Sequence, residues 1–389
     1  MIRMINASTT ELDDVDTALA EIMNQIDLKT LSKNAAGILS CYYEFIESGI
    51  VKKLCEALPF DVIGLTTMSS ASDGDYGMYR LTLTILTSDD VAFQSAMTRP
   101  LSLDDFEAPL RDAWQEAKEK LPGEPSFVIA AFPVVPNLSS ADILKGFDKV
   151  CQGIPVWGGV LSDVTMSFEN GKTICNGRDD QNALAMLLLH GPVQPGFIVT
   201  SLPDRNIQER RAVVTESKGC VVKKANNMVL QEYFQSLGLT LRMGVDATSS
   251  VPLMVSYGDG SQPVALGIYS MNADGSALCA GEIPEGAEFS IGSIDSEGIL
   301  ETAKSTVERA LEGKKPQGIL MFPCVSRYGM LAPRNESELQ EVLRVVEELG
   351  KNEVPFALAY VGGEICPVAG NDGKLHNRLH NYTFAACVF

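Results

Sequence analysis

Five polar residues in the C-terminal part of the chain have side chains suited to binding a small zwitterion: Cys324, Arg327, Glu364, His380 and Asn381. The fork of donors on Arg327 matches a ligand carboxylate, and Glu364 can accept from a ligand ammonium group. His380 and Asn381 can orient either group. All five lie at or after the ends of predicted strands, where ligands of open α/β sheets bind. The pattern predicts a pocket for a small molecule like an amino acid. Arg327→Ala should abolish binding of that ligand and leave the fold intact.

Other interpretations of the same residues stay open. Arg327 and Glu364 can form a buried ion pair that fixes two loops, and His380 can cap a loop. Cys324 and His380 can be the nucleophile and base of an enzyme, with Arg327 favouring the thiolate. Against catalysis, the chain has only three histidines and no nucleophile elbow. A third interpretation is a protein-interaction module whose acidic surface meets a partner.

A second group of candidate binding residues carries glycines: Trp157, Gly158, Gly159, Asp163 and Gly363. The glycine pairs fall in corresponding parts of two predicted strands. They can serve a ligand, or they can simply allow close packing of the backbone. A phosphate cradle would need the GxGxxG spacing, which is absent.

The elements that must position these residues follow one order three times: helix, strand, helix, strand, then a loop and another strand. The helices that open the three copies are expected at 14–25, 105–121 and 298–312. The strands are expected at 35–42, 61–69 and 78–88, at 126–133, 154–163 and 183–190, and at 318–324, 354–365 and 383–389. The strands are short, almost continuous apolar runs, which is typical of sheets covered on both faces.

The fold class that follows is α/β, with repeated helix-strand-helix-strand-strand units forming sheets covered by helices. The length of 389 residues exceeds what one core usually fills, so we expect two domains. Between the second and third copies, over residues 196–296, Gly, Asp and Ser punctuate shorter strand-like runs. We place a domain boundary near residue 205.

The composition of the chain limits which partners are expected. The formal net charge of −19 repels phosphate backbones and anionic membrane surfaces, so neither nucleic acid nor a membrane is an expected partner. Nine scattered cysteines form no CxxC pair, which predicts reduced thiols and a cytoplasmic location without a zinc or redox site. The N-terminus has no apolar signal core. We expect no metal and no cofactor.

Several segments together resemble the FIST family, which takes its name from F-box and intracellular signal transduction proteins. The resemblance covers about residues 30–389 and rests on the order of the motifs, none of which is specific alone. The segments are VIGLTTMSSASDG (62–74), WGG with Asp163, the Asn-Gly loop at 170–171, AVVTESKGCVVKKANNMVLQEYFQSLGL (212–239), PEG (284–286), CVSR (324–327), GE (363–364) and HNYT (380–383).

The resemblance implies a sensory module for small ligands, which have been suggested to include amino acids. It implies a FIST N-like domain at 1–205 and a FIST C-like domain at 206–389. No signalling domain is visible beside them, so we expect the output to pass through a separate signalling partner.

Overall fold

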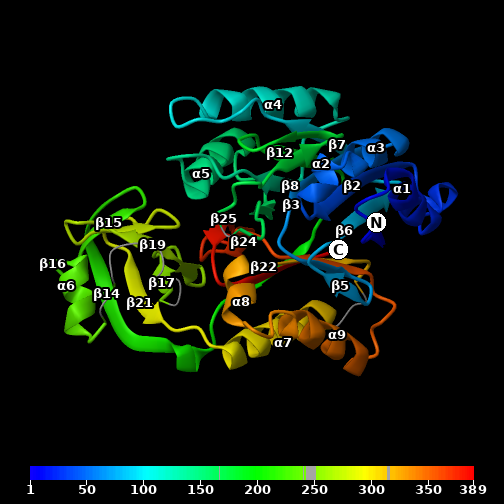
Figure 1. Cartoon of the computed structure of the whole chain (residues 1–389). Coiled ribbons are helices and arrows are strands. Elements are labelled where there is room, and N and C mark those ends of the chain that lie inside the picture. Colours follow the sequence, from blue (N-terminus) through cyan, green and yellow to red (C-terminus); the bar gives the residue numbers. More distant parts are fainter. Residues whose placement is uncertain (166, 240, 242–250, 313–315) are drawn as a thin grey trace.

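The computed structural model describes residues 1–165, 167–239, 241, 251–312 and 316–389. Their strands form four sheets, and helices lie over the sheets (Figure 1). The chain has the mixed α/β fold predicted from the sequence, built from repeated units. Three of the sheets have six strands each and share one arrangement, whereas the fourth is formed by a segment inserted into the third unit.

The three six-stranded sheets each contain a central parallel pair, flanked on both sides by antiparallel strands. The first sheet runs β1 (Arg3–Thr9), β6 (Leu81–Ser88), β2 (Asn34–Cys41), β3 (Asp61–Thr66), β10 (Thr173–Cys175), β11 (Arg178–Asp180). The second runs β7 (Ala92–Met97), β12 (Ala185–His190), β8 (Phe127–Phe132), β9 (Val156–Val160), β24 (Gly363–Ala369), β25 (Leu375–His380). The third runs β13 (Gly196–Thr200), β26 (Phe384–Val388), β22 (Ile319–Pro323), β23 (Phe356–Ala359), β4 (Ser70–Ser72), β5 (Asp75–Gly77).

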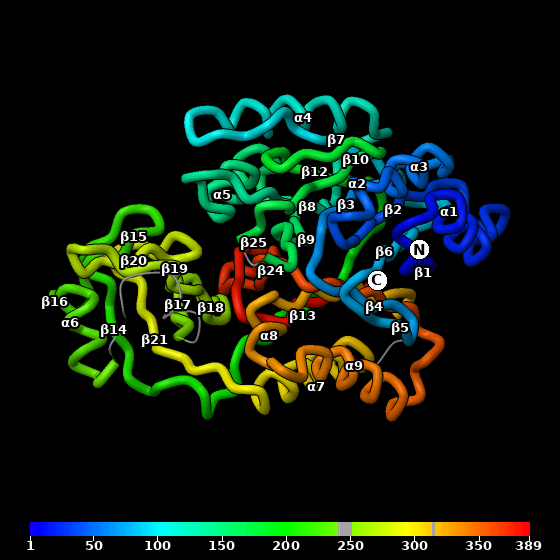
Figure 2. Tube along the Cα trace, viewed as in Figure 1, coloured from blue at the N-terminus to red at the C-terminus, as the bar shows by residue number. Residues whose placement is uncertain are grey.

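Each six-stranded sheet ends in a hairpin that another unit donates. The first unit gives β4–β5 to the third sheet, the second gives β10–β11 to the first, and the third gives β24–β25 to the second. The three units thus exchange hairpins in a cycle, and each six-stranded sheet contains strands from two units. Figure 2 shows the blue β4–β5 hairpin beside the orange and red strands of the third unit.

One predicted strand is wrong. The segment 354–365 is not a single strand, because β23 ends at Ala359 in the third sheet and β24 begins at Gly363 in the second. Where the chain passes from the third sheet to the second, the amide of Val361 donates to Pro323 O, and the amide of Gly362 donates to Val160 O at 2.8 Å. A Cβ on Gly362 would come within 2.7 Å of a backbone oxygen, so glycine permits the close approach.

Three of the longer helices begin at a residue whose side chain caps the helix. Asp14, Ser139 and Asp295 cap the N-termini of three helices by accepting from backbone amides at 2.7–3.0 Å. The helices are α1 (Val15–Asn24), α2 (Glu44–Glu47), α3 (Ile50–Ala57), α4 (Glu107–Lys120), α5 (Ser140–Cys151), α6 (Leu230–Ser236), α7 (Ser296–Leu311), α8 (Val325–Met330) and α9 (Ser337–Glu348). Figure 1 shows α4 and α5 along one side of the molecule and α7 and α9 along the other.

Residues 207–292 are here called the inserted segment, and the described strands within it form the fourth, antiparallel sheet. Its strands are β14 (Ile207–Lys218), β15 (Val221–Ala225), β16 (Met228–Val229), β17 (Leu253–Ser256), β18 (Val264–Leu266), β19 (Ile268–Met271), β20 (Ala277–Cys279) and β21 (Glu288–Gly292). The chain leaves the body at Asn206 and returns at Asp295, and the Asn206 Nδ2 amide donates to the Asp295 carboxylate at 2.5 Å. The two chain connections between the body and the inserted segment therefore lie next to each other.

Candidate functional site

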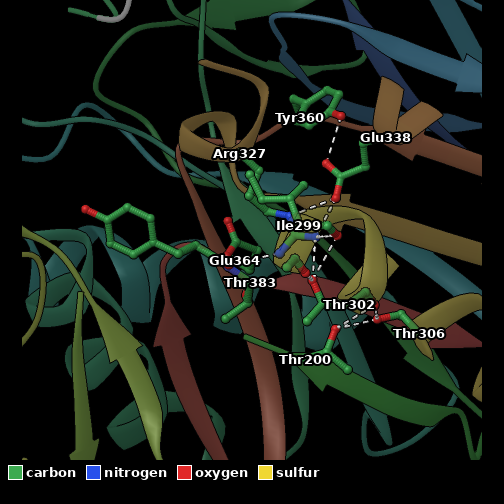
Figure 3. A network of polar contacts seen from close by, with 11 residues as sticks. Thr200, Ile299, Thr302, Thr306, Arg327, Glu338, Tyr360, Glu364 and Thr383 are labelled. Atoms are coloured by element: carbon green, nitrogen blue, oxygen red, sulfur yellow. Dashed lines mark hydrogen bonds and ion pairs between the residues drawn. The ribbon is translucent and has the colours of Figure 1, made fainter. Parts of the chain in front are cut away.

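Arg327 of α8 lies at the centre of a buried polar network (Figure 3). Its Nε donates to Glu338 Oε1 at 2.8 Å, and its Nη1 donates to Tyr382 O at 3.1 Å. Its Nη2 donates to Ile299 O at 2.8 Å and to Thr302 Oγ1 at 2.9 Å. All three nitrogens therefore have partners in the protein, and a ligand carboxylate would have to compete with them.

The ion-pair partner of Arg327 is Glu338 of α9. Both side chains are completely buried, and the Nη2–Oε1 distance is 2.5 Å. The other carboxylate oxygen of Glu338 accepts from the Tyr360 hydroxyl at 2.8 Å. The alternative that the sequence left open, an ion pair of Arg327 with Glu364, is therefore wrong, because α9 brings the Glu338 carboxylate against the guanidinium. The pair joins α7, α8, α9 and the chain after β23.

Glu364 lies on β24, where it is fully buried. Its Oε2 accepts from the backbone amide of Thr383 at 3.2 Å and from the hydroxyl of the same residue at 2.5 Å. Its Oε1 is buried and has no hydrogen-bond partner in the described part of the chain. Burial raises the pKa of this carboxyl to about 8, so Glu364 is mostly a neutral acid at pH 7.

Cys324 and His380 do not form a reactive pair in this structure. Burial, and then the neighbouring Glu364, raise the pKa of the Cys324 thiol, which opposes the thiolate that a nucleophile needs. The His380 Nε2 atom lies 3.2 Å from Cys366 O, and burial lowers the pKa of His380 to about 4. The imidazole is therefore neutral at pH 7, and the arrangement does not favour a cysteine-dependent enzyme.

Asn381 connects the body to the inserted segment. Its backbone amide donates to Ala265 O at 2.8 Å, and its Oδ1 accepts from the Gly267 amide at 3.1 Å. Glu364 and His380 are directly opposite each other in the β24–β25 pair. The structure thus gathers Cys324, Glu364, His380 and Asn381 around one corner of the third unit, next to the Arg327 network.

The glycine-bearing group lies on a neighbouring strand. Glu364 is paired with Gly159 across β24 and β9, and Gly363 is paired with Val160. A Cβ on Gly158 would lie 1.9 Å from a backbone oxygen of β8, so this glycine serves close packing of the backbone.

Trp157 and Asp163 both make contacts inside the protein. The Trp157 ring is buried and stacks on Phe322, with 4.3 Å between ring centroids, and this stacking joins the second and third units. Its indole Nε1 has no hydrogen-bond partner among the described residues. Asp163 accepts from the backbone amides of Thr165 and Asn170, both at 2.7 Å, within the second unit.

The open space near this corner is a groove between the third unit and the inserted segment, about 450 Å³ in volume. It is lined by Val199, Thr200, Ser201, Leu202, Pro203, Asp204, Ile207, Met254, Gln262, Pro263, Glu301, Thr302, Ser305, His380 and Thr383. Of the residues proposed from the sequence, only His380 reaches it. Thr302 and Thr383 connect its floor to Arg327 and Glu364 (Figure 3).

The groove residues that the sequence argument missed lie on α7 and in the inserted segment. Thr302 and Ser305 share one side of α7 with Glu301. This polar side of the helix was visible in the sequence and could have indicated that α7 lines a groove. Met254 and Gln262 gave no comparable signal in the sequence. They come from a separate part of the chain, which only the fold brings close to α7.

The chain belongs to the FIST family. The FIST N domain model matches residues 35–228, and the FIST C domain model matches residues 228–367. FIST domains are sensory domains of signal transduction, so the family assigns a sensory role to this chain. The division into domains at residue 205 stays a prediction.

Two solved structures share a distant likeness. One is a cyanuric acid hydrolase from A. caulinodans, 10% identical, with a TM-score of 0.35, covering 100% of this chain and 99% of that one. The other is also a cyanuric acid hydrolase, 9% identical, with a TM-score of 0.28, covering 75% of this chain and 99% of that one. Such similarity says nothing about what this chain binds or catalyses. A comparison with curated protein sequences finds no match.

Two further features concern the described residues alone. No helix among them has the length and apolar character needed to cross a membrane. No three His, Cys, Asp or Glu side chains in this part of the chain come together as a metal site would require.

Proposed function

We propose that this chain is a cytoplasmic sensor that binds a small polar metabolite in the groove beside α7 and signals through a protein partner. The observation that carries the proposal is that the two walls of the groove come from different parts of the chain. One wall comes from β13 and α7 of the body, and the other includes Met254 and Gln262 of the inserted segment. A ligand between them would favour one position of the inserted segment over others, which is how binding becomes a signal.

Amino acids are the first ligand class to test. Asp204 at the groove can attract an ammonium group, as can Glu301, whose ion pair with Arg205 is exposed to water. The Gln262 amide and Ser305 hydroxyl can donate to a carboxylate. In this proposal His380 contributes to the floor directly. Arg327, Glu364, Cys324 and Asn381 act beneath or beside it, by fixing Thr302, Thr383 and the inserted segment.

A thermal-shift screen of amino acids and related amines tests the proposal. We expect one compound to raise the melting temperature, because a ligand at about 100 times its dissociation constant adds about 2.7 kcal/mol of stability. Ser305→Tyr should abolish that shift, since the larger side chain fills a half-buried position of the groove without touching the buried network.

Lys304→Tyr is the matched control. It places the same side chain one residue earlier on α7, at an exposed position outside the groove, and should keep the ligand response. A shift that survives Ser305→Tyr would place the ligand elsewhere. No shift with any compound would instead favour a protein-interaction module, for which the acidic composition is the supporting feature.

A further inference from the structure

A second groove lies on another side of the inserted segment, between that segment, α5 and β25, and has a volume of about 360 Å³. Two cationic side chains from different elements line it, Lys145 of α5 and Arg378 of β25. We propose that this groove binds a small dicarboxylate, with one carboxylate on each cation. The inference concerns a site separate from the groove beside α7 and does not depend on a ligand binding there.

Lys145 is held by a carboxylate that a ligand can replace. Its Nζ lies 2.6 Å from Glu282 Oε2, across the boundary between the body and the inserted segment. The two side chains are 60% and 36% exposed. Exposed ion pairs of this kind stabilise proteins by only about 0–1 kcal/mol. A ligand carboxylate can therefore displace Glu282 at small cost, and the displaced side chain can turn towards water.

Arg378 offers a donor that the protein leaves unused. Its guanidinium lies 4.5 Å from the centre of the Tyr257 ring, and its Nη2 donates to Asp259 at 2.5 Å. Its Nε is buried and has no hydrogen-bond partner among the described residues. A buried donor left without an acceptor lowers stability. A ligand oxygen that accepts from this nitrogen would remove that cost.

The remaining acidic side chain of the groove is engaged by a neighbour within the body. Asp148 lines the wall, and its Oδ1 accepts from Asn377 Nδ2 at 2.6 Å. Burial raises the pKa of Asp148. The groove also carries apolar surface from Leu144, Leu266 and Leu379, which suits the methylenes between two carboxylates.

Binding would compete with contacts that hold the inserted segment. Glu282 and Asp259 both belong to that segment, and each is paired with a cation of the body. A dicarboxylate on Lys145 and Arg378 takes over one or both cations. The ligand therefore loosens the inserted segment on this side, and amide hydrogen exchange at 280–284 should become faster when the ligand is bound.

Isothermal titration with succinate tests the site, and neutral succinamide serves as the ligand control because it has the same shape without charge. We expect succinate to bind the full chain and succinamide not to bind. Lys145→Gln should weaken succinate binding by about three- to five-fold, a loss of up to about 1 kcal/mol, because the ammonium group is exposed. Lys149→Gln should leave it unchanged, because Lys149 is on the same helix but pairs with Glu107 outside this groove.

A second variant keeps the test decisive if charge loss disturbs the fold. Arg378→Lys retains the positive charge but loses the Nε donor and the planar fork, and it should also weaken binding. The proposal is overturned if succinate does not bind at millimolar concentrations, if succinamide binds equally well, or if both Lys145→Gln and Arg378→Lys bind like the wild type. Unchanged exchange at 280–284 with succinate bound would overturn the displacement of Glu282.

Discussion

Glu338→Ala is expected to lower the free energy of unfolding by about 3–5 kcal/mol, the typical cost of leaving one member of a buried ion pair without its partner. The substitution removes both carboxylate oxygens from a completely buried position. Arg327 then keeps its charge, with only the neutral acceptors Ile299 O, Thr302 Oγ1 and Tyr382 O around it. The Tyr360 hydroxyl also loses its acceptor.

Chemical and thermal unfolding of the purified variant measure this effect. The matched control is Glu348→Ala, which removes the same side chain from the same helix. Glu348 is paired with Arg344, but at 56% exposure this pair is screened by water, so the control should change stability by less than about 1 kcal/mol. Equal effects of the two substitutions would show that the Arg327–Glu338 pair does not support the fold.

The same network changes what Arg327→Ala is expected to do. From the sequence, this variant should lose its ligand and keep its fold. In the structure, Arg327 is buried and joined to α7, α9 and the β25–β26 corner. Its removal leaves the Glu338 carboxylate without a counter-charge, so we expect destabilisation. Loss of ligand binding in this variant would then not identify a contact residue.

Local patterns predicted most of the repeated elements because the helices have a regular apolar period and the central strands are continuous apolar runs. The helix expected at 298–312 is observed at Ser296–Leu311, and the strand expected at 126–133 is observed at Phe127–Phe132. The short hairpin strands were missed. Strands such as Ser70–Ser72 carry small polar residues and pair with a sheet distant in the sequence, so no local apolar pattern marks them.

The candidate corner was also partly predictable. The types and positions of Glu364, His380 and Asn381 after strand ends indicated that they gather, and the structure brings them together. The partner of Arg327 was not recognised, although a signal existed. Glu338 precedes Val342 by four residues and Val345 by seven, so it lies on the apolar side of its helix. A carboxylate on such a face indicates a buried partner.

Glu364→Gln is expected to stabilise the protein above pH 8 and to have little effect near pH 5. The ordinary pKa of a glutamate is 4.5, and burial raises that of Glu364 to about 8 in the folded protein. The folded state therefore binds this proton more tightly than the unfolded state. The contribution of Glu364 to stability is full below pH 4.5, falls progressively as the pH rises from 4.5 to about 8, and is fully lost above that. Glutamine is neutral throughout and avoids that loss.

The size of the effect follows from the same shift. One pKa unit corresponds to about 1.4 kcal/mol, so the rise from 4.5 to about 8 gives at most roughly 5 kcal/mol at high pH. Melting temperatures of the wild type and the variant from about pH 5 to pH 9 measure it, and only their difference matters, since His380 and the surface acids titrate in both. Glu56→Gln, at an exposed position, should show no such pH-dependent difference. A variant that follows the wild type in parallel across this range would show that Glu364 is ionised in the folded protein, with a counter-charge or water at its buried Oε1.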